Sequence, residues 1–242
     1  MSTVKRAGET AERLLAAATE LFAERGFRAT TLREVAARAG TNLASANYHF
    51  KSKQQLYLTV LRRHLDEMQE RLSQAGAALD ARTVARLSAA EASEILGRRI
   101  SAMVSFLLGP PPAPEGAMLL RELSDPSKML PWLIDELFTP QLSATRSLLR
   151  RIAPGLRGRA LEHAAFSVVA QGVFYRVMLA VLQHWNGGKE LRATTADEVS
   201  RHVLAFSLGG LQAIGGTPGP RPGLRRTVDA RRRSSPSRVR LA

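Results

Sequence analysis

Apolar residues recur at helical spacing through most of this chain, and no segment alternates in the way that predicts a β-strand. The first clear stripe runs from Leu14 to Phe22, and Gly26 follows it as a helix stop, with Phe27 placed to fold back on the core. A later stripe, from Leu56 to Leu61, gives another helix its own apolar face. The pattern predicts an all-α protein.

A short helix is predicted to begin after Thr31. Thr31 and Glu34 have the spacing of a capping box, in which each side chain accepts a hydrogen bond from a backbone N–H group at the helix start. Gly40 ends the helix, because glycine accepts the left-handed backbone of a sharp exit. Between these positions lies one apolar stripe: Leu32, Val35, Ala36 and Ala39.

A second short helix is predicted over Leu43 to Tyr48. Asn42 can cap its start, and residues 52–55, Ser-Lys-Gln-Gln, form another capping box that opens a third helix. Ser45 and Asn47 are small and polar, so this helix could enter a major groove and hydrogen-bond base edges, with asparagine suited to adenine. Two short helices joined by a glycine turn are typical of a helix-turn-helix DNA-binding motif.

The same segment resembles the N-terminal DNA-binding domain of the TetR family of bacterial repressors, over about residues 8–68. A linked series of motifs is more specific than any one of them, because a helix-glycine-helix pattern alone is common in helical bundles. The motifs that carry the resemblance are Glu9 to Gly26, the Thr31 to Glu34 box, Ala39-Gly40, Tyr48-His49-Phe50 and Ser52-Lys53.

The resemblance implies a set of DNA contacts. Thr31 and Tyr48 would touch phosphates, and Lys53 would neutralise a phosphate from the start of its helix. His49 would lie beside the DNA backbone, or be solvated. The predicted DNA-binding residues are Thr31, Asn42, Leu43, Ala44, Ser45, Asn47, Tyr48, His49 and Lys53.

The chain departs from the family pattern at Leu43 and Ala44, where a lysine and a glycine are frequent. One phosphate contact is therefore missing, and Leu43 is expected to pack on a thymine methyl or on the protein. Tyr48 and Phe50 also have a simpler interpretation, because either aromatic ring could be a core residue.

The charge of +14 is unevenly distributed. Residues 1–65 hold eleven Lys and Arg against five Asp and Glu, residues 217–242 hold eight against one, and the stretch between them is nearly neutral. This pattern favours a nucleic-acid partner for the N-terminal part. The C-terminal stretch is rich in Pro, Gly, Ser and Arg and is expected to be disordered; residues 231–233 could add sequence-independent DNA affinity or have no fixed partner.

Helices are predicted for the rest of the chain at roughly 84–109, 116–123, 128–152, 159–184 and 196–214. We expect three regions: a helix-turn-helix DNA-binding domain over 8–68, a helical effector-binding and dimerisation domain over 69–216, and a basic tail over 217–242. The chain has no cysteine and its N-terminus lacks the apolar stretch of a secretory signal, so we expect a cytoplasmic protein.

The stretch 164–182 is nearly long and apolar enough for a membrane span, but Ser167, Gln171 and Arg176 argue against one. A soluble helix that is apolar on all sides needs extra cover, and a second subunit can supply it. We therefore expect a homodimer formed by 159–184 and 196–214. In the resembling family the last two helices form such an interface, and the dimer reads a pseudo-palindromic operator.

Methionine and aromatic residues are frequent in the middle of the chain, where they could line a ligand pocket or simply fill a core. Arg121 and Glu122, in the sequence RELSDP, could orient a polar effector of unknown identity, or form a surface turn. RELSDP and the later WLIDELFTPQL resemble the CecR-like branch of the family. The predicted effector-binding residues are Met103, Phe106, Arg121, Glu122, Trp132, Phe166 and Tyr175.

The sequence contains no Gly-x-Ser-x-Gly elbow, no Gly-x-x-x-x-Gly-Lys phosphate loop, no His-Glu-x-x-His motif and no cysteine nucleophile. No catalytic residue, cofactor or metal is therefore predicted, and the protein is not expected to be an enzyme. The leading hypothesis is a dimeric repressor that leaves its operator when a small molecule binds. The alternative is a sequence-indifferent architectural nucleic-acid-binding protein that uses the basic N-terminal part and tail.

Overall fold

The computed structural model describes residues 2–109, 114–188 and 195–215, and within these ranges it contains helices and no strand. The all-α prediction is thus confirmed. The predicted tail, 217–242, lies outside the described residues. The helices are α1 Ser2–Ala29, α2 Leu32–Arg38, α3 Leu43–Phe50, α4 Lys53–Gln74, α5 Ala81–Arg86, α6 Ala89–Leu108, α7 Pro114–Ser124, α8 Leu130–Leu133, the π-helix η1 Ile134–Phe138, α9 Thr139–Ile152, α10 Gly158–Val177, α11 Leu179–Trp185 and α12 Thr195–Gly215.

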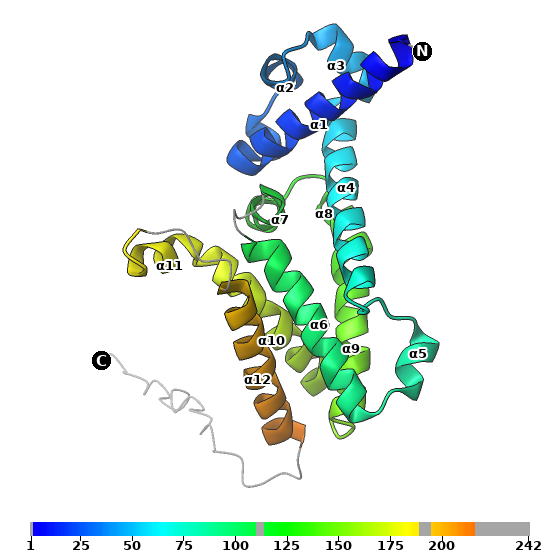
Figure 1. Ribbon diagram of the computed structural model, residues 1–242, viewed down its shortest axis with the longest axis vertical. Helices are drawn as coiled ribbons and strands as arrows, with labels where there is room; N and C mark the ends of the chain where they lie inside the picture. Colours follow the sequence, from blue (N-terminus) through cyan, green and yellow to red (C-terminus); the bar gives the residue numbers. More distant parts are fainter. Residues whose placement is uncertain (1, 110–113, 189–194, 216–242) are drawn as a thin grey trace, which may run out of the picture.

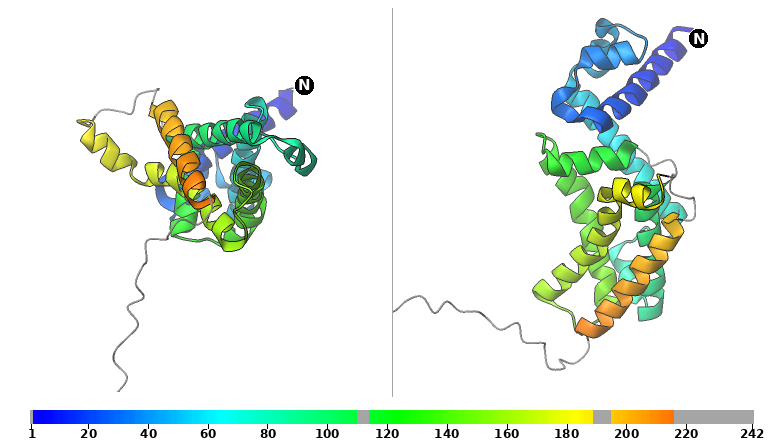
Figure 2. Two further views of the ribbon diagram at one scale, coloured as in Figure 1. Left: turned by 90° about the horizontal axis from the view of Figure 1, so that it is seen from below. Right: turned by 90° about the vertical axis from the view of Figure 1, so that its left-hand side faces the viewer.

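The molecule is elongated, with a head formed by α1, α2 and α3 at one end (Figure 1). The long helix α4 starts in this head and runs down one side of a body formed by the later helices. In the right-hand view of Figure 2, α7 lies directly beneath the head and α10 and α12 form an outer face of the body. The predicted domain boundary at residue 68 falls inside α4, and the three-region division stays a prediction.

The helix starts in the head follow the capping signals. Thr31 Oγ1 accepts a hydrogen bond from Glu34 N at 3.2 Å, and the Glu34 carboxylate accepts one from Thr31 N at 2.8 Å, so the predicted capping box is confirmed. Asn42 Oδ1 accepts from Ser45 N at 2.8 Å and caps α3. Ser52 caps α4 in the same way, through Gln55 N at 3.1 Å, but the Gln55 side chain makes no return bond to Ser52 N, so only half of the capping box predicted over 52–55 forms.

Gly26 interrupts the first helix, with φ 78° and ψ 174°. The chain turns there, and Phe27 folds back to pack 6.3 Å from the Phe22 ring and 5.0 Å from the Tyr57 ring. This is the packing that the glycine stop and the following aromatic residue predicted.

Two of the predicted helices are divided. The segment 84–109 breaks at Leu87, because Ser88 and Glu91 form a second complete capping box that starts α6. The segment 128–152 is divided by the π-helix η1, which directly precedes α9; Pro140, in the first turn of α9, has no N–H group for the regular hydrogen-bond ladder.

The predicted helix 159–184 also breaks, at Met178, into α10 and α11. The two parts are bent by 60°. Within the described residues no single helix has the length and apolar character of a membrane span, whereas α10 and α11 taken together would pass on length and composition.

Two hydrophobic cores hold the molecule together. One lies in the body, among α6, α9, α10 and α12. The other fills the head, but it is completed by side chains of later elements: Met118 of α7, Met129, Leu133 of α8 and Leu137 of η1. The head is therefore packed against the body over a shared apolar core, and its position depends on the helices beneath it.

Candidate DNA-binding head and effector cavity

Helix α3 has one buried face and one exposed face. Ala46 and Phe50, four residues apart, are buried in the core of the head. Ala44, Asn47 and Tyr48 are exposed and share the opposite face, because residues three and four apart are neighbours on a helix. The exposed face carries small or polar groups beside one aromatic ring, as a helix that enters a DNA groove requires.

The structure separates the two aromatic residues at the end of α3. Tyr48 is 80% exposed and is not a core residue, whereas Phe50 is 7% exposed and belongs to the core. His49 is half-buried, with its ring 5.2 Å from that of Tyr48. Leu43 and Ser45 are also half-buried. The Tyr48 hydroxyl is therefore free to reach a ligand outside the head.

Lys53 has a structural role in the head. Its Nζ donates to the carbonyl oxygens of Phe27 at 2.9 Å and Arg28 at 3.4 Å, and it lies 4.4 Å from the centroid of the Phe27 ring. Lysine has three N–H donors, so one remains for a phosphate. Thr31, at the start of α2, is exposed, although its hydroxyl already donates to the Glu34 carboxylate at 2.8 Å.

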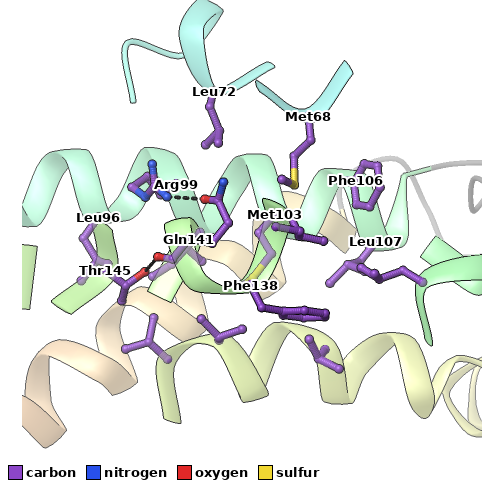
Figure 3. A pocket seen from close by; sticks show the side chains of 16 residues that line it. Met68, Leu72, Leu96, Arg99, Met103, Phe106, Leu107, Phe138, Gln141 and Thr145 are labelled. Carbon is purple, nitrogen blue, oxygen red and sulfur yellow. Dashed lines mark hydrogen bonds between the residues drawn. The ribbon is translucent and has the colours of Figure 1, made fainter. Parts of the chain in front are cut away.

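The body contains a largely apolar cavity with a volume of about 90 Å³. Its lining comes from α4, α6, α7, η1, α9 and α10, and Figure 3 shows Met68, Met103 and Phe138 around it. Ligand pockets usually measure about 300–1,000 Å³. A drug-sized effector would therefore have to move side chains, and methionines, with three rotatable bonds, are suited to that.

The polar groups of the cavity lie together at one side. Arg99 of α6, only 8% exposed, donates from Nη1 to the carbonyl oxygen of Ala77 at 2.8 Å and from Nη2 to Gln141 Oε1 (Figure 3). Thr145 Oγ1, one turn after Gln141, donates to the Gln141 carbonyl at 2.9 Å. Burial lowers the pKa of the Arg99 guanidinium, but arginine stays protonated at neutral pH.

Comparison with known sequences decides the family. Residues 14–60 match the bacterial regulatory proteins of the tetR family, and residues 92–211 match the C-terminal domain of the HTH-type transcriptional dual regulator CecR. The chain belongs to the TetR family. It has the CecR type of C-terminal domain, and the family consists of DNA-binding transcriptional regulators rather than enzymes.

One curated relative is the HTH-type transcriptional activator FasR of Mycolicibacterium smegmatis, 45% identical over 62 residues, which is 26% of this chain and 28% of FasR. The HTH-type transcriptional dual regulator CecR of Shigella flexneri is 54% identical over 52 residues, 21% of this chain and 23% of that protein. The matched segments thus span about a quarter of each relative. An activator and a dual regulator both occur among the relatives, so family membership does not fix the sign of regulation.

Solved structures share the fold along most of the chain. A TetR-like regulator from Rhodococcus sp. RHA1 superposes with a TM-score of 0.62 at 21% identity, covering 84% of this chain and 95% of its own. AibR, solved in complex with isovaleryl coenzyme A and operator DNA, gives 0.62 at 16% identity, covering 81% and 97%. At these identities the likeness concerns the fold.

In the structure of this TetR-family protein, the predicted effector-binding residues do not lie together at one site. Met103 and Phe106 line the cavity. Phe166 is 57% exposed on α10, Tyr175 packs against the core of the body, and Trp132 packs against the core of the head. These three side chains do not line the cavity.

Arg121 and Glu122 contact the head instead of the cavity. The Arg121 guanidinium donates to the carbonyl oxygens of Ala23 at 3.3 Å and Glu24 at 2.9 Å, near the end of α1. A Cβ on Gly26 would lie 2.7 Å from Arg121 Cδ, so any other residue there would displace the Arg121 side chain and would also be strained by the positive φ. Arg121 thus supplies hydrogen-bond donors to two carbonyl groups of α1 just before its interruption at Gly26.

Glu122, 2% exposed, is bonded on both of its oxygens. Oε2 accepts from the Tyr57 hydroxyl at 2.7 Å and Oε1 accepts from Ser127 N at 2.9 Å. Burial, followed by the bond to Glu122, raises the pKa of the Tyr57 hydroxyl far above its usual value, so it remains a donor. This bond ties α4 of the head to α7 of the body.

The residue that sequence reasoning missed is Arg99, with its partner Gln141. The signal was present, because Arg99 occupies a core position in the apolar stripe of α6, three residues after Leu96 and four before Met103. Among the described residues there is no group of three or more His, Asp or Glu able to hold a metal ion.

Proposed function

We propose that this protein is a homodimeric repressor that binds a pseudo-palindromic DNA operator and leaves it when a small-molecule effector enters the cavity of the body. One observation carries the proposal: a single helix, α4, has its first residue, Lys53, in the DNA-binding head and its later residues Met68 and Leu72 in the cavity wall. An effector that moves the wall would also move the helix that carries the head.

The exposed face of α3 supports the operator-reading part of the proposal. Asn47 and Ser45 would hydrogen-bond base edges, while Tyr48, Thr31 and the free donor of Lys53 would hold phosphates. Asn42 already caps α3 through Oδ1, which leaves its amide N–H groups for the DNA. Ala44 allows close approach of the helix, and Leu43 and His49 would lie at its edges.

An exposed apolar stripe supports the homodimer. Phe166, Phe174 and Val177 are 57–60% exposed and recur at i, i+8 and i+11 along α10. Phe206 and Ile214 of α12, which packs beside α10, are also largely exposed. A second copy would bury this surface and set two heads on two half-sites roughly 34–36 Å, or a multiple of that distance, apart.

Among the described residues, apolar side chains line the cavity except at one side, where Arg99, Gln141 and Thr145 lie. An apolar lining with a few polar groups is typical of a small-molecule site, so we propose that the effector is a small molecule. AibR, solved with isovaleryl coenzyme A and operator DNA, provides a precedent for one fold binding both kinds of partner. As a regulator of transcription, the protein is proposed to act in the cytoplasm, on the nucleoid.

The decisive experiment is the selection of bound genomic fragments by the purified full-length protein at physiological salt, followed by binding titrations. An inverted repeat shared by the fragments, bound by a dimer, is the expected result. Fragments without a shared motif, bound with steep salt dependence, would favour the architectural protein instead.

The matched variants are Asn47→Ala and Asn186→Ala, which removes an exposed asparagine after α11. Asn47→Ala should cost about 1–3 kcal/mol of operator affinity and relax preference at one position of each half-site. Asn186→Ala should change neither. A promoter reporter then tests the sign: removal of the protein should raise transcription from a promoter that contains the repeat.

A further inference from the structure

Arg99 and Gln141 lie between two spaces. On one side is the apolar cavity of about 90 Å³. On the other is an open surface hollow of about 480 Å³ between α4, α6 and α9, which Arg99, Gln141 and Leu72 also line. The hydrogen bond between the Arg99 guanidinium and the Gln141 amide (Figure 3) therefore joins two residues that line both the cavity and the hollow.

Among the described residues, the guanidinium of Arg99 has no acidic partner within ion-pair distance. Its hydrogen bonds go to two neutral oxygens, those of Ala77 and Gln141. These bonds use two of its five N–H donors. Buried charges are ordinarily paired, so this cation is arranged to accept an anion from outside the chain.

The space next to this charge suits an apolar chain. Side chains of leucine, isoleucine, valine, phenylalanine and methionine form nearly all of the remaining cavity lining. Met68 of α4 and Met103 of α6 can change rotamer to lengthen the space. A flexible aliphatic tail can follow such a narrow cavity more easily than a rigid drug-sized ring system can.

The outer hollow limits the size and charge of the head group. Asp66 and Glu70 line it together with Arg99. Two carboxylates disfavour a head group with several negative charges, such as the phosphates of a nucleotide carrier. A head group with a single carboxylate meets less of this repulsion, because it carries only one negative charge.

We propose that Arg99 and Gln141 bind the head group of a free aliphatic monocarboxylate whose tail enters the cavity. The carboxylate accepts hydrogen bonds from the guanidinium and from the Gln141 side-chain N–H₂, and it displaces the bond that now joins the two residues. The proposal rests on the proposed function only in taking this cavity as the effector site.

The site is tested by isothermal titration of the full-length protein with straight-chain carboxylates from hexanoate to dodecanoate, below their micelle concentrations. The matched probes are the alcohol and the coenzyme A thioester of each chain length. Carboxylates should bind about tenfold or more tightly than the alcohols, because a charge-assisted hydrogen bond is lost with the alcohol. Equal binding of acid and alcohol, or binding of the thioester alone, would overturn the assignment.

Two variants test whether Arg99 binds the head group of the ligand. Arg99→Met keeps an unbranched apolar stem but removes the guanidinium, and it should remove the preference for acid over alcohol. The control Arg98→Met, on the exposed neighbour that lies 3.9 Å from Glu94, should keep that preference. Gln141→Glu puts a carboxylate of the protein beside the guanidinium. Acid affinity should then fall about tenfold or more while alcohol affinity is unchanged. Retained acid preference in a folded Gln141→Glu protein contradicts the proposal even if Arg99→Met fails to fold.

Operator binding by the same proteins separates this proposal from the repressor function. If carboxylates bind through Arg99 but leave operator affinity unchanged, the head-group assignment stands and the effector response is wrong. If another small molecule releases the operator equally well from wild type and Arg99→Met, and carboxylates do not bind, the repressor stands and the head-group assignment is wrong.

Discussion

Helix α4 meets a buried charge near each end, and the two charges are held differently. Near its start, Tyr57 donates to Glu122, whose second oxygen is bonded to Ser127 N. Near its end, Met68 and Leu72 line the cavity beside Arg99, which also bonds the Ala77 carbonyl just after the helix. Both Glu122 oxygens have partners in a filled core, whereas Arg99 has donors to spare beside an open space.

This difference indicates which end of α4 can respond to a ligand. Both Glu122 oxygens are hydrogen-bonded, so a substitution of Glu122 leaves buried polar groups unpaired. The end of α4 near Glu122 should therefore be rigid, and substitutions there should lower the free energy of unfolding. The Arg99 end can exchange one polar partner for another at little cost, and its methionine neighbours can move. Substitutions at the two ends of α4 should therefore differ in their effect on stability.

Glu122→Ala should have the largest effect on stability. It leaves the Tyr57 hydroxyl and Ser127 N without their partner in a buried place, and should lower the free energy of unfolding by about 3 kcal/mol. Urea unfolding at pH 7 measures the change, and Glu94→Ala, at an exposed position of α6, is the control. A loss as small as that of the control would show that the head does not depend on this bond.

Tyr57→Phe should cost less, about 2 kcal/mol, because only one charge-assisted hydrogen bond is lost. Burial, and then Glu122, raise the pKa of Tyr57 above the usual value of about 10. The stability due to the protonated hydroxyl is therefore fully present below pH 10 or so and is lost as the pH rises further. The difference between wild type and Tyr57→Phe should be constant from neutral pH to about pH 9 and shrink above it; a difference that grows with pH would contradict the assignment.

Gly172→Ala should alter the cavity more than the stability. An added Cβ on Gly172 of α10 would contact the end of the Met103 side chain, which must move. Helix propensity favours alanine by about 1 kcal/mol and offsets this cost, so the free energy of unfolding should change by less than that. The longest aliphatic acid that binds should become shorter. Gly8→Ala, with open space around its Cβ, is the control; an unchanged chain-length limit would show that Met103 does not bound the binding site.

Arg99→Met should have the smallest effect on stability. The substitution removes a buried charge that has no ion-pair partner, and this gain offsets the loss of the hydrogen bonds to the Ala77 and Gln141 oxygens, so the free energy of unfolding should change by less than about 1 kcal/mol. Urea unfolding at pH 7 measures the change, so the free energies of unfolding of Arg99→Met and Glu122→Ala can be compared directly. A loss as large as that of Glu122→Ala would mean that both ends of α4 are equally fixed, and the contrast between them would disappear.

The head could be predicted largely from sequence because its signals are local. Thr31, Asn42 and Ser52 each cap the helix that follows them, and Gly26 takes the positive φ expected of a helix stop. Ser88 and Glu91 carried the same kind of signal for α6, so the division of 84–109 was also readable. The bend at Met178 has no glycine or proline to mark it, and we find no local cause for it in the sequence.

The body was harder to predict because its site depends on contacts between distant segments. Arg121 meets α1 across 97 or more residues of sequence, and Glu122 meets Tyr57 across 65. From the sequence alone, the charged pair in RELSDP is equally compatible with a ligand site and with a contact to another helix. Only the packing of the helices distinguishes the two. Arg99 could have been noticed in the stripe of α6, but its partner Gln141 lies on another helix, 42 residues away.

The shared core beneath the head has a practical consequence for building hybrid regulators. A head cut out at residue 68 would expose the apolar surface that Met118, Met129 and Leu133 now cover. Moving residues 8–68 alone onto a foreign sensor should therefore yield an aggregating or poorly folded protein. The transferable unit is discontinuous in sequence, and a graft that keeps operator preference should carry α7, α8 and η1 together with the head.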